Sequence, residues 1–381
     1  MREAVIVSAV RSPVGRRGGV FSDLHPVELG AQVLGGLVGS VALDPSHIDD
    51  VIWGCVGQAG EQAGDIARTT VLAAGWPIEV PGVTVDRQCG SSQQALHFAV
   101  AGVVAGHYDA VVAGGVESMT RVPMGSPRGD ADNYGPSFLA RFGGTRPNQG
   151  IGAEMIAEQW GLTRAQCDEF ALLSHSRAAD AQDRGAFDDE IVPITLPDGT
   201  VITQDEGVRR GSTPEKLASL SPAFRPDGMI TAANSSQMSD GAAAVLVMSA
   251  DKASELGLTP LARVHTAVVV GSDPVIMLTG PIPATRKALE RSGLALHEID
   301  TFEVNEAFAP VTLAWLADIG ADPARLNPDG GAIALGHPLG GSGARLLTTM
   351  IHRMRREGMR YGLQTMCEGG GQANATILEA L

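Results

Sequence analysis

The stretch VDRQCGSSQQALHFAV, residues 85–100, places Cys89 between a short β-like run and a helical pattern. Gly90 and the two serines after it predict that a helix begins near residue 91. A thiol at that junction would lie at the N-terminus of the helix, where free N–H groups and the helix dipole stabilise a thiolate. Cys89 is therefore a candidate nucleophile, although the same stretch also suits a small, buried structural cysteine.

The helix that follows Cys89 indicates how the chain is layered. From Ala95 to Ala105 it is apolar on all sides apart from His97. A helix that is apolar around its whole circumference is usually buried. We therefore expect it to lie between two sheets in a layered α/β stack.

Short β-branched runs alternate with helical patterns on either side of this helix. We expect strands at residues 4–10, 50–56, 83–86 and 110–113, and helices near residues 26–39, 65–74 and 91–105. Such alternation is typical of βαβ units and predicts a mostly parallel sheet.

The second half of the chain repeats landmarks of the first. A strand start, a glycine-rich turn and a strand end follow one another at similar spacing: Asp50, Cys89 and Gly114-Gly115, then Asp300, His337 and Cys367. Loops at the carboxyl ends of parallel strands converge, so we expect both turns to meet at one shared cleft.

An irregular segment separates the two halves. Residues 123–150 are rich in Gly, Pro and Asp without any period, which indicates a long loop or the start of an inserted lid. Thr163 and Gln166 then have capping-box spacing, and a long helix is expected to end at Gly185. A hairpin should turn at Asp198-Gly199.

Bulk composition narrows the class of protein. With 381 residues the chain suits two or three domains, and its net charge of −15 argues against nucleic acid or acidic membranes as partners. An anionic ligand would need a local basic cluster. The four cysteines are too few for a disulfide framework, and no run approaches the roughly 18 apolar residues of a membrane span. We therefore expect a cytoplasmic protein.

Two further residues could act together with the Cys89 thiol as acid or base. His337 lies in GGAIALGHPLGGSGAR, where Gly336 and Pro338 constrain the imidazole, and a thiol needs such a base to become a thiolate at neutral pH. The alternative interpretation of this motif is a glycine-rich turn with an incidental histidine. A phosphate-binding loop fits poorly, because the motif has no lysine at the P-loop position. Cys367 begins CEGGGQANATILEA directly after an expected strand, and a thiol before three glycines in a near-surface loop suits an acid/base better than packing.

The remaining polar candidates are weaker when taken singly. Asn305 and Glu306 end a strand that starts near residue 301, and the amide could anchor a water or donate to a developing oxyanion. A turn residue at a strand end is the alternative for Asn305. Cys55 and Cys167 are interpreted as buried structural cysteines.

Four blocks in order, DRQCGSSQQA, NEAFAP, GGAIALGHPLGGSGAR and CEGGGQANATILEA, resemble the thiolases, and the resemblance starts at the N-terminal VIVSAVRSPVGR. It implies two pseudo-repeated βαβαβαββ halves in a layered α-β-α-β-α stack, with an inserted loop domain. The expected boundaries are residues 1–118 with 239–261 for the N-terminal half, 119–238 for the coenzyme A-binding lid and 262–381 for the C-terminal half.

The resemblance also implies roles for individual residues. Cys89 would be the nucleophile, His337 its base and Cys367 an acid/base. His337 and a water held by Asn305 would stabilise an enolate oxygen, and the N–H groups of Cys89 and Gly369 would hold the tetrahedral oxyanion. Neither a metal nor a permanently bound cofactor is implied.

Coenzyme A is the implied co-substrate. Ser236 matches a serine that meets the pantetheine, and Phe308 would line its tunnel. A compact basic stretch would suit the phosphates, with a solvated charged turn as the alternative: Arg209, Arg210, Lys216 and Arg225.

The implied activity is that of a degradative thiolase, which cleaves a 3-ketoacyl-CoA to acetyl-CoA and a shortened acyl-CoA through an acyl-cysteine, in fatty-acid or steroid catabolism. The alternative is an acetoacetyl-CoA acetyltransferase, but its usual His-Met-Gly is replaced by Gln149-Gly150-Ile151-Gly152. A non-catalytic acyl-CoA carrier is a remote third possibility, and it would be expected to lack Cys89, His337 or Cys367. The family implies a homodimer or homotetramer.

Overall fold

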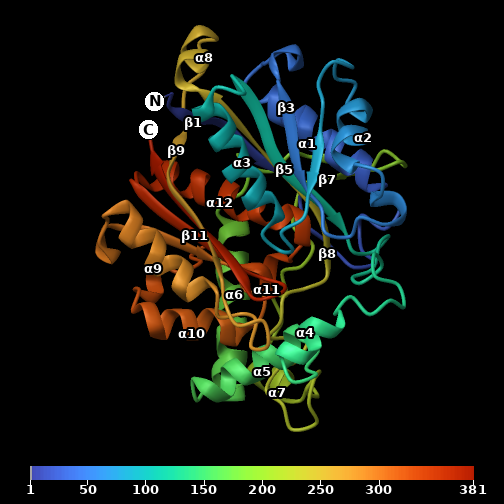
Figure 1. Ribbon diagram of the computed structural model, residues 1–381, viewed down its shortest axis with the longest axis vertical. Helices are drawn as coiled ribbons and strands as arrows, with labels where there is room; N and C mark the ends of the chain where they lie inside the picture. The colour runs from blue at the N-terminus through green and yellow to red at the C-terminus, as the bar shows by residue number, and fades with distance from the viewer. Residues whose placement is uncertain (1) are drawn as a thin grey trace.

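In the computed structural model, which describes residues 2–381, ten strands form one mixed sheet in the order β10-β11-β12-β9-β1-β8-β5-β3-β4, with β2 beside β8 (Figure 1). Strands β6 and β7 form a separate pair. The strands are β1 (Ala4–Arg11), β2 (Gly15–Arg16), β3 (Asp50–Gly54), β4 (Val83–Val85), β5 (Ala110–Ser118), β6 (Ile194–Thr195), β7 (Val201–Ile202), β8 (Ser239–Ser249), β9 (Ala262–Gly271), β10 (Thr301–Val304), β11 (Tyr361–Glu368) and β12 (Gln372–Ala380).

Helices cover the sheet and form the irregular end of the molecule. They are α1 (Pro26–Gly39), α2 (Ile66–Ala73), α3 (Ser91–Ala105), α4 (Pro136–Arg141), α5 (Gln149–Gln159), α6 (Arg164–Asp183), α7 (Pro214–Ala218), α8 (Ala250–Glu255), α9 (Pro281–Ser292), α10 (Ala309–Ile319), α11 (Ala332–Leu335) and α12 (Ser342–Glu357). From Arg2 to Leu381, no helix is both long enough and apolar enough to cross a bilayer.

The strand pairing confirms the predicted repeat. In the first half β3 and β5 are parallel, and β5, β8 and β1 continue antiparallel. In the second half β10 and β11 are parallel, and β11, β12 and β9 continue antiparallel. The halves join where Val5 and Ile6 of β1 pair with Arg263 and Ala262 of β9. The prediction of a mostly parallel sheet was wrong, because each half ends in an antiparallel series.

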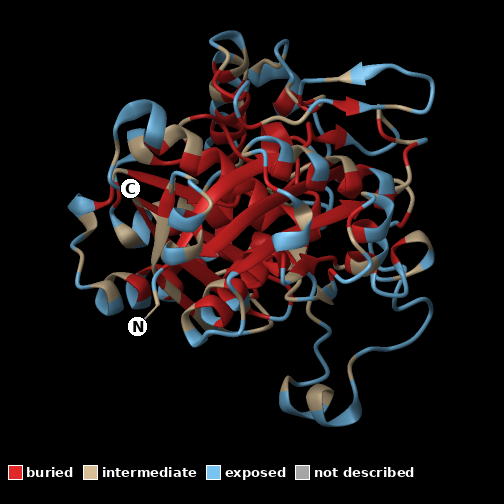
Figure 2. Cartoon of the chain, turned by 90° about the horizontal axis from the view of Figure 1, so that it is seen from above, coloured by how far each residue is buried: buried red, intermediate tan, exposed pale blue. Residues whose placement is uncertain are grey.

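Helices α3 and α12 pack between the two halves of the sheet. Leu96 of α3 and Leu347 of α12 belong to one buried cluster with Val245 of β8 and Leu378 of β12. Separate clusters lie under α1 and α2 and under α9 and α10. Figure 2 accordingly shows the buried residues concentrated in the strands and helices at the centre of the molecule. The predicted layered stack is confirmed.

One detail of α3 differs from the prediction. The side chain of Phe98 is 48% exposed, and Ala101 is also exposed, so one face of this apolar helix is open. An apolar periodicity cannot distinguish a face covered by the sheet from a face that the chain itself leaves uncovered.

The segment between β5 and β8 contains α4 to α7 and the β6–β7 pair. It leaves the sheet after Ser118 and returns at Ser239, and Ser118 pairs with Asp240 in the sheet. Figure 1 places α4, α5 and α7 together at the end of the molecule opposite the chain termini. The predicted capping box at Thr163 and the hairpin turn at Gly199 are both confirmed.

The first-half landmark at Gly114-Gly115 is not a strand end, because β5 continues to Ser118. These glycines instead allow close packing. A Cβ at Gly115 would lie 2.2 Å from the carbonyl oxygen of Gly340, so the main chains of the two halves touch at this point.

Candidate active site

Cys89 lies where the sequence predicts, two residues before the first turn of α3. Gln88 has a left-handed φ of 49°, and Gly90 is the N-cap of the helix. Burial, followed by the charge of Glu368, raises the pKa of Cys89 to about 12, and the N–H groups of Cys89 and Gly369 oppose this rise only in part. Burial therefore outweighs the expected effect of the helix N-terminus, and Cys89 rests as a thiol that needs a base.

Cys367 lies inside β11. The expectation that it lies in a near-surface loop was wrong. The ladder with β12 extends to Glu368 and Gln372, and the tight turn falls at Gly370 and Gly371, which both have left-handed φ values. Cys367 is buried in one cluster with Met277 and Phe308. Burial and the neighbouring Cys89 raise the pKa of Cys367 well above its ordinary value, so this thiol holds its proton.

The segments that carry the two thiols are in contact. A Cβ added to Gly369 would lie 2.8 Å from Oε1 of Gln88, and one added to Gly90 would lie 2.0 Å from Oε1 of Glu368. Because Glu368 follows Cys367 in β11, its side chain reaches the start of α3. Burial raises the pKa of Glu368 to about 8, against the opposing charge of Arg87.

His337 lies in a buried turn between α11 and α12. Its Nδ1 is 2.6 Å from Oγ of Ser342, and that hydroxyl donates its hydrogen to the carbonyl of Pro338 at 2.8 Å. The hydroxyl must therefore accept a hydrogen from Nδ1, which leaves the lone pair on Nε2. Burial and then the charge of Arg345 lower the pKa of His337 to about 3, so the imidazole is neutral and can act as a base at Nε2.

Asn305 lies beside His337. Its Nδ2 is 3.4 Å from Nε2 of His337, and its backbone N–H donates to the carbonyl of Thr365. The Oδ1 of Asn305 is buried without a hydrogen-bond partner among residues 2–381. The amide group is thus held at the base with one free acceptor.

Two buried glutamates hold the turn of His337 from both sides. Glu117 of β5 accepts hydrogen bonds from the N–H groups of Val56, Gly57 and Gly340, so it joins the first half to the loop after His337.

Glu306 is the second of these glutamates. It accepts hydrogen bonds from Oγ of Ser174, from Nδ2 of Asn327 and from the N–H of Ile333. The base is therefore fixed by groups from both halves of the chain.

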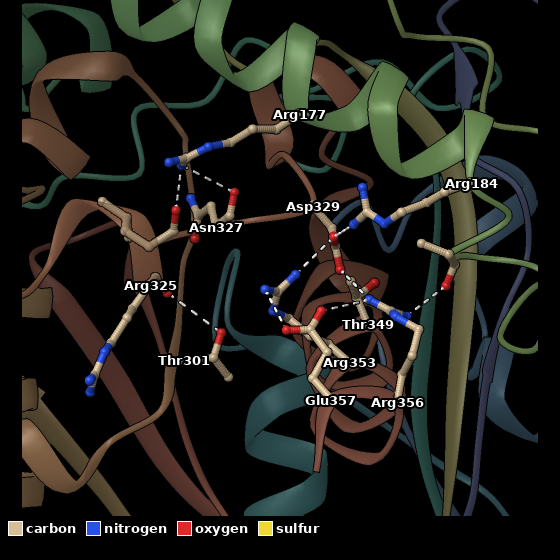
Figure 3. Close-up of polar contacts among 12 residues, drawn as sticks. Arg177, Arg184, Thr301, Arg325, Asn327, Asp329, Thr349, Arg353, Arg356 and Glu357 are labelled. Atoms are coloured by element: carbon tan, nitrogen blue, oxygen red, sulfur yellow. Dashed lines mark hydrogen bonds and ion pairs between the residues drawn. The ribbon is translucent and has the colours of Figure 1, made fainter. Parts of the chain in front are cut away.

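A buried ionic cluster anchors the far end of α12. Asp329 accepts hydrogen bonds from Arg184, which follows α6, and from Arg353 and Arg356 of α12 (Figure 3). Asp329 is only 1% exposed. This ionic cluster thus fixes the helix whose first residue is Ser342.

A cavity of about 460 Å³ opens beside His337, and we call it the Ser236 cavity. Ser236, Phe308 and Arg209 line it, so these predicted residues lie with the histidine. Lys216 lies next to it, because Lys216 and Arg209 line a smaller cavity of about 190 Å³.

The other two predicted basic residues are engaged elsewhere. Arg210 pairs with Asp183 at 2.8 Å, and Arg225 pairs with Glu158. Neither lines the Ser236 cavity.

Several site residues were missed by the sequence reasoning. Arg16 and Arg17 line the Ser236 cavity, and their signal is the run VGRRGG, two adjacent arginines between glycines. Arg16 pairs with Glu206, whereas Arg17 and Arg209 have no carboxylate partner within the described part of the chain. Ser342 was also missed, although it lies five residues after His337 in GGAIALGHPLGGSGAR.

Comparisons with known proteins agree along the whole chain. The profile described as "Thiolase, N-terminal domain" matches residues 4–251, and "Thiolase, C-terminal domain" matches residues 258–380. The sequence is 51% identical to the steroid 3-ketoacyl-CoA thiolase FadA6 of Mycobacterium tuberculosis, covering 100% of this chain and 95% of that protein. It is 44% identical to the 3-ketoacyl-CoA thiolase FadA of Escherichia coli, with 100% of both covered. The crystal structure of the Bacillus anthracis acetyl-CoA acetyltransferase superposes with a TM-score of 0.92 at 41% identity, covering 100% of this chain and 99% of that one.

Proposed function

The chain belongs to the thiolase family, and we propose that Cys89, His337 and Cys367 together carry the thiolytic cleavage of a 3-ketoacyl-CoA. The enzyme is a degradative acyltransferase with coenzyme A as its co-substrate. The observation that supports these roles most directly is the contrast between the groups: two buried thiols that hold their protons, and a buried neutral imidazole whose Nε2 faces Asn305 and whose turn packs against Cys89 through Leu339.

The first half-reaction begins at Cys89. Nε2 of His337 takes the thiol proton, and the thiolate attacks the 3-keto carbon of the substrate. The resulting Nε2–H, together with a water held by Asn305, donates to the enolate oxygen that forms when the carbon–carbon bond breaks. The N–H groups of Cys89 and Gly369 stabilise the tetrahedral oxyanion, and one such donor is worth about 2.7–4 kcal/mol.

Cys367 completes the first half-reaction. The carbon–carbon bond electrons leave as the enolate of acetyl-CoA, and the thiol of Cys367 gives its proton to the carbanionic carbon. A new coenzyme A thiol then loses its proton to Cys367 and attacks the acyl-cysteine. The shortened acyl-CoA departs, and Cys89 takes back the proton held by His337.

Coenzyme A fits the Ser236 cavity best. Ser236 and Phe308 would contact the pantetheine, while Arg17 and Arg209, which have no carboxylate partner among residues 2–381, would meet the phosphates at the same cavity. Lys216, beside Arg209, would extend this basic site. A chain with a net charge of −15 needs such a local basic cluster to attract a polyanionic ligand.

Intact-mass trapping tests the assigned roles. After incubation with a 3-ketoacyl-CoA without free coenzyme A, the wild-type chain should carry an acyl adduct on Cys89, and Cys89→Ala should carry none. Cys367→Ala should still accept an acyl group from a saturated acyl-CoA but should not cleave the 3-ketoacyl-CoA. Absence of any adduct on the wild type would support a non-catalytic carrier, and equal loss in both variants would contradict the separate roles. A homodimer or homotetramer and a cytoplasmic location stay predictions.

A further inference from the structure

A second cavity, of about 530 Å³, lies against the catalytic turn, and we call it the Gly370 cavity. It shares Met124, Gln149, Phe224 and Phe308 with the Ser236 cavity, so the two cavities are adjacent. Gln88, Gly369 and Gly370 also line it, which brings it next to Cys89 and to the turn after Cys367. Its volume is in the usual range for a site that binds a small organic group.

The two cavities divide the substrate between them if coenzyme A takes the first, as proposed above. The reacting carbon would then lie between the two cavities, where Gln88 and Gly369 bring the segments of Cys89 and Cys367 to the cavity wall. The acyl group then has the Gly370 cavity available on the other side of that carbon. This inference therefore rests on the proposed function and adds the chemical class of the acyl group.

The lining of the Gly370 cavity mixes apolar and polar side chains, and its outer end is polar and solvent-exposed. Met277 and Phe308 lie at the catalytic end, because both pack in one cluster with Cys367. At the other end the lining comes from the segment after β5 and includes Arg128, Asn133 and Tyr134. A plain aliphatic chain would gain little from these polar groups, because burial against them removes their water without replacing its hydrogen bonds.

Arg128 is the one side chain in this lining that is charged at neutral pH, and the lining contains no aspartate or glutamate. Across residues 2–381 its guanidinium makes neither a hydrogen bond nor an ion pair. The neighbouring carboxylate, Asp132, is already paired with Arg146 at 2.7 Å. Tyr134 and Phe138 of this exposed segment stack on each other, with their ring centroids 4.7 Å apart. Arg128 is therefore a free cation at the polar end of a cavity that starts at the catalytic thiols.

We propose that the Gly370 cavity binds an acyl group that ends in a carboxylate, and that Arg128 recognises that carboxylate. A guanidinium binds a carboxylate through two parallel N–H donors, which gives both affinity and orientation. In a chain of charge −15, an acidic acyl group would otherwise be repelled, so a lone arginine has a strong effect on selection. The substrate class is thus a 3-ketoacyl-CoA with a terminal carboxylate.

The test compares two substrates of equal length, 3-oxooctanoyl-CoA and 3-oxooctanedioyl-CoA, which differ only in a terminal methyl or carboxylate. Thiolysis by coenzyme A is measured with the full chain, with Arg128→Gln and with Arg141→Gln, a control at the end of α4 in the same segment that does not line the cavity and has no carboxylate partner among residues 2–381. The wild type should have the higher kcat/KM for the dioyl substrate. Arg128→Gln should lose about tenfold on that substrate, as expected for a charge-assisted hydrogen bond, with little change for the methyl-ended one.

The outcomes separate the two proposals. If the wild type prefers the methyl-ended substrate, or if Arg128→Gln lowers both rates equally, the carboxylate assignment is wrong while the thiolase reaction stands. If neither substrate is cleaved and no acyl adduct forms on Cys89, the proposed function itself fails. Arg128→Lys should recover part of the preference, because the charge remains and the paired donors do not.

Discussion

The hydroxyl of Ser342 accepts the Nδ1–H of His337, because its own hydrogen is donated to the carbonyl of Pro338. In Ser342→Ala the imidazole loses the partner that holds the proton on Nδ1, and the imidazolium proposed to form during catalysis loses an acceptor. We expect kcat to fall about tenfold or more, as for the loss of a hydrogen bond to a charged group, with a small change in KM. Steady-state kinetics and the rate of Cys89 alkylation across pH measure this effect.

A matched control for Ser342 is Ser292→Ala, in which the hydroxyl also donates to a backbone carbonyl, that of Leu289, but far from the site. Ser292→Ala should leave kcat and the alkylation profile unchanged. Loss of thermal stability in Ser342→Ala with an unaltered kcat would show that the serine has a structural role only.

Glu368 predicts an alkaline limit to activity. Its raised pKa of about 8 means that the carboxyl is neutral below that pH and charged above it. A negative charge beside Cys89 and Cys367 opposes formation of the Cys89 thiolate, so wild-type kcat/KM should fall as the pH rises above 8. Glu368→Gln cannot ionise and should keep its activity to higher pH. Identical pH profiles between pH 7 and 9.5 would refute this coupling.

Asp329 should be a major determinant of stability. Asp329→Ala leaves Arg353 without its buried carboxylate, and breaking a buried pair in this way typically costs about 3–5 kcal/mol. A lowered thermal midpoint and a lowered urea midpoint measure the loss. Glu255→Ala, which removes an exposed pair with Lys252, is the control and should cost less than about 1 kcal/mol. Similar effects of the two substitutions would argue against a structural role for the cluster.

His97 should make the free energy of unfolding depend on pH in the acidic range. Burial and then the charge of Arg87 lower the pKa of His97 to about 4, so the unfolded chain binds a proton here at a higher pH than the folded chain does. This histidine therefore costs stability as the pH falls from about 6.5 to 4, by up to about 3 kcal/mol. The difference in unfolding free energy between wild type and His97→Gln should shift in favour of the variant over that window. A pH-independent difference would contradict a neutral buried imidazole.

Much of the fold followed from local patterns. Strand and helix alternation, the capping box at Thr163 and the turn at Gly199 depend on neighbouring residues, and all three were predicted. The antiparallel series in each half was not predicted, since the direction in which a strand returns to a sheet depends on contacts distant in the sequence. Exposure of Phe98 was missed for the same reason.

The positions of the candidate site residues in the fold were predictable, and their electrostatics were not. The spacing of the glycine-rich turns singled out Cys89 and His337 as candidates, but no local pattern shows that burial outweighs the helix N-terminus and leaves Cys89 protonated. Supporting residues such as Glu117 could not be predicted, because their partners are backbone N–H groups, here those of Gly57 and Gly340, which no residue type reveals.

The 119–238 segment leaves the sheet after Ser118 and returns beside it at Asp240, and it is also tied to β1 by the buried ion pairs of Arg11 with Glu190 and Asp205. Because these pairs join the segment to the sheet, it can be exchanged between relatives only if both acids are kept. A chimaera that carries residues 119–238 of another thiolase and retains Glu190 and Asp205 should therefore take on the donor's preference for acyl groups, while the chemistry of the native cysteines is unchanged.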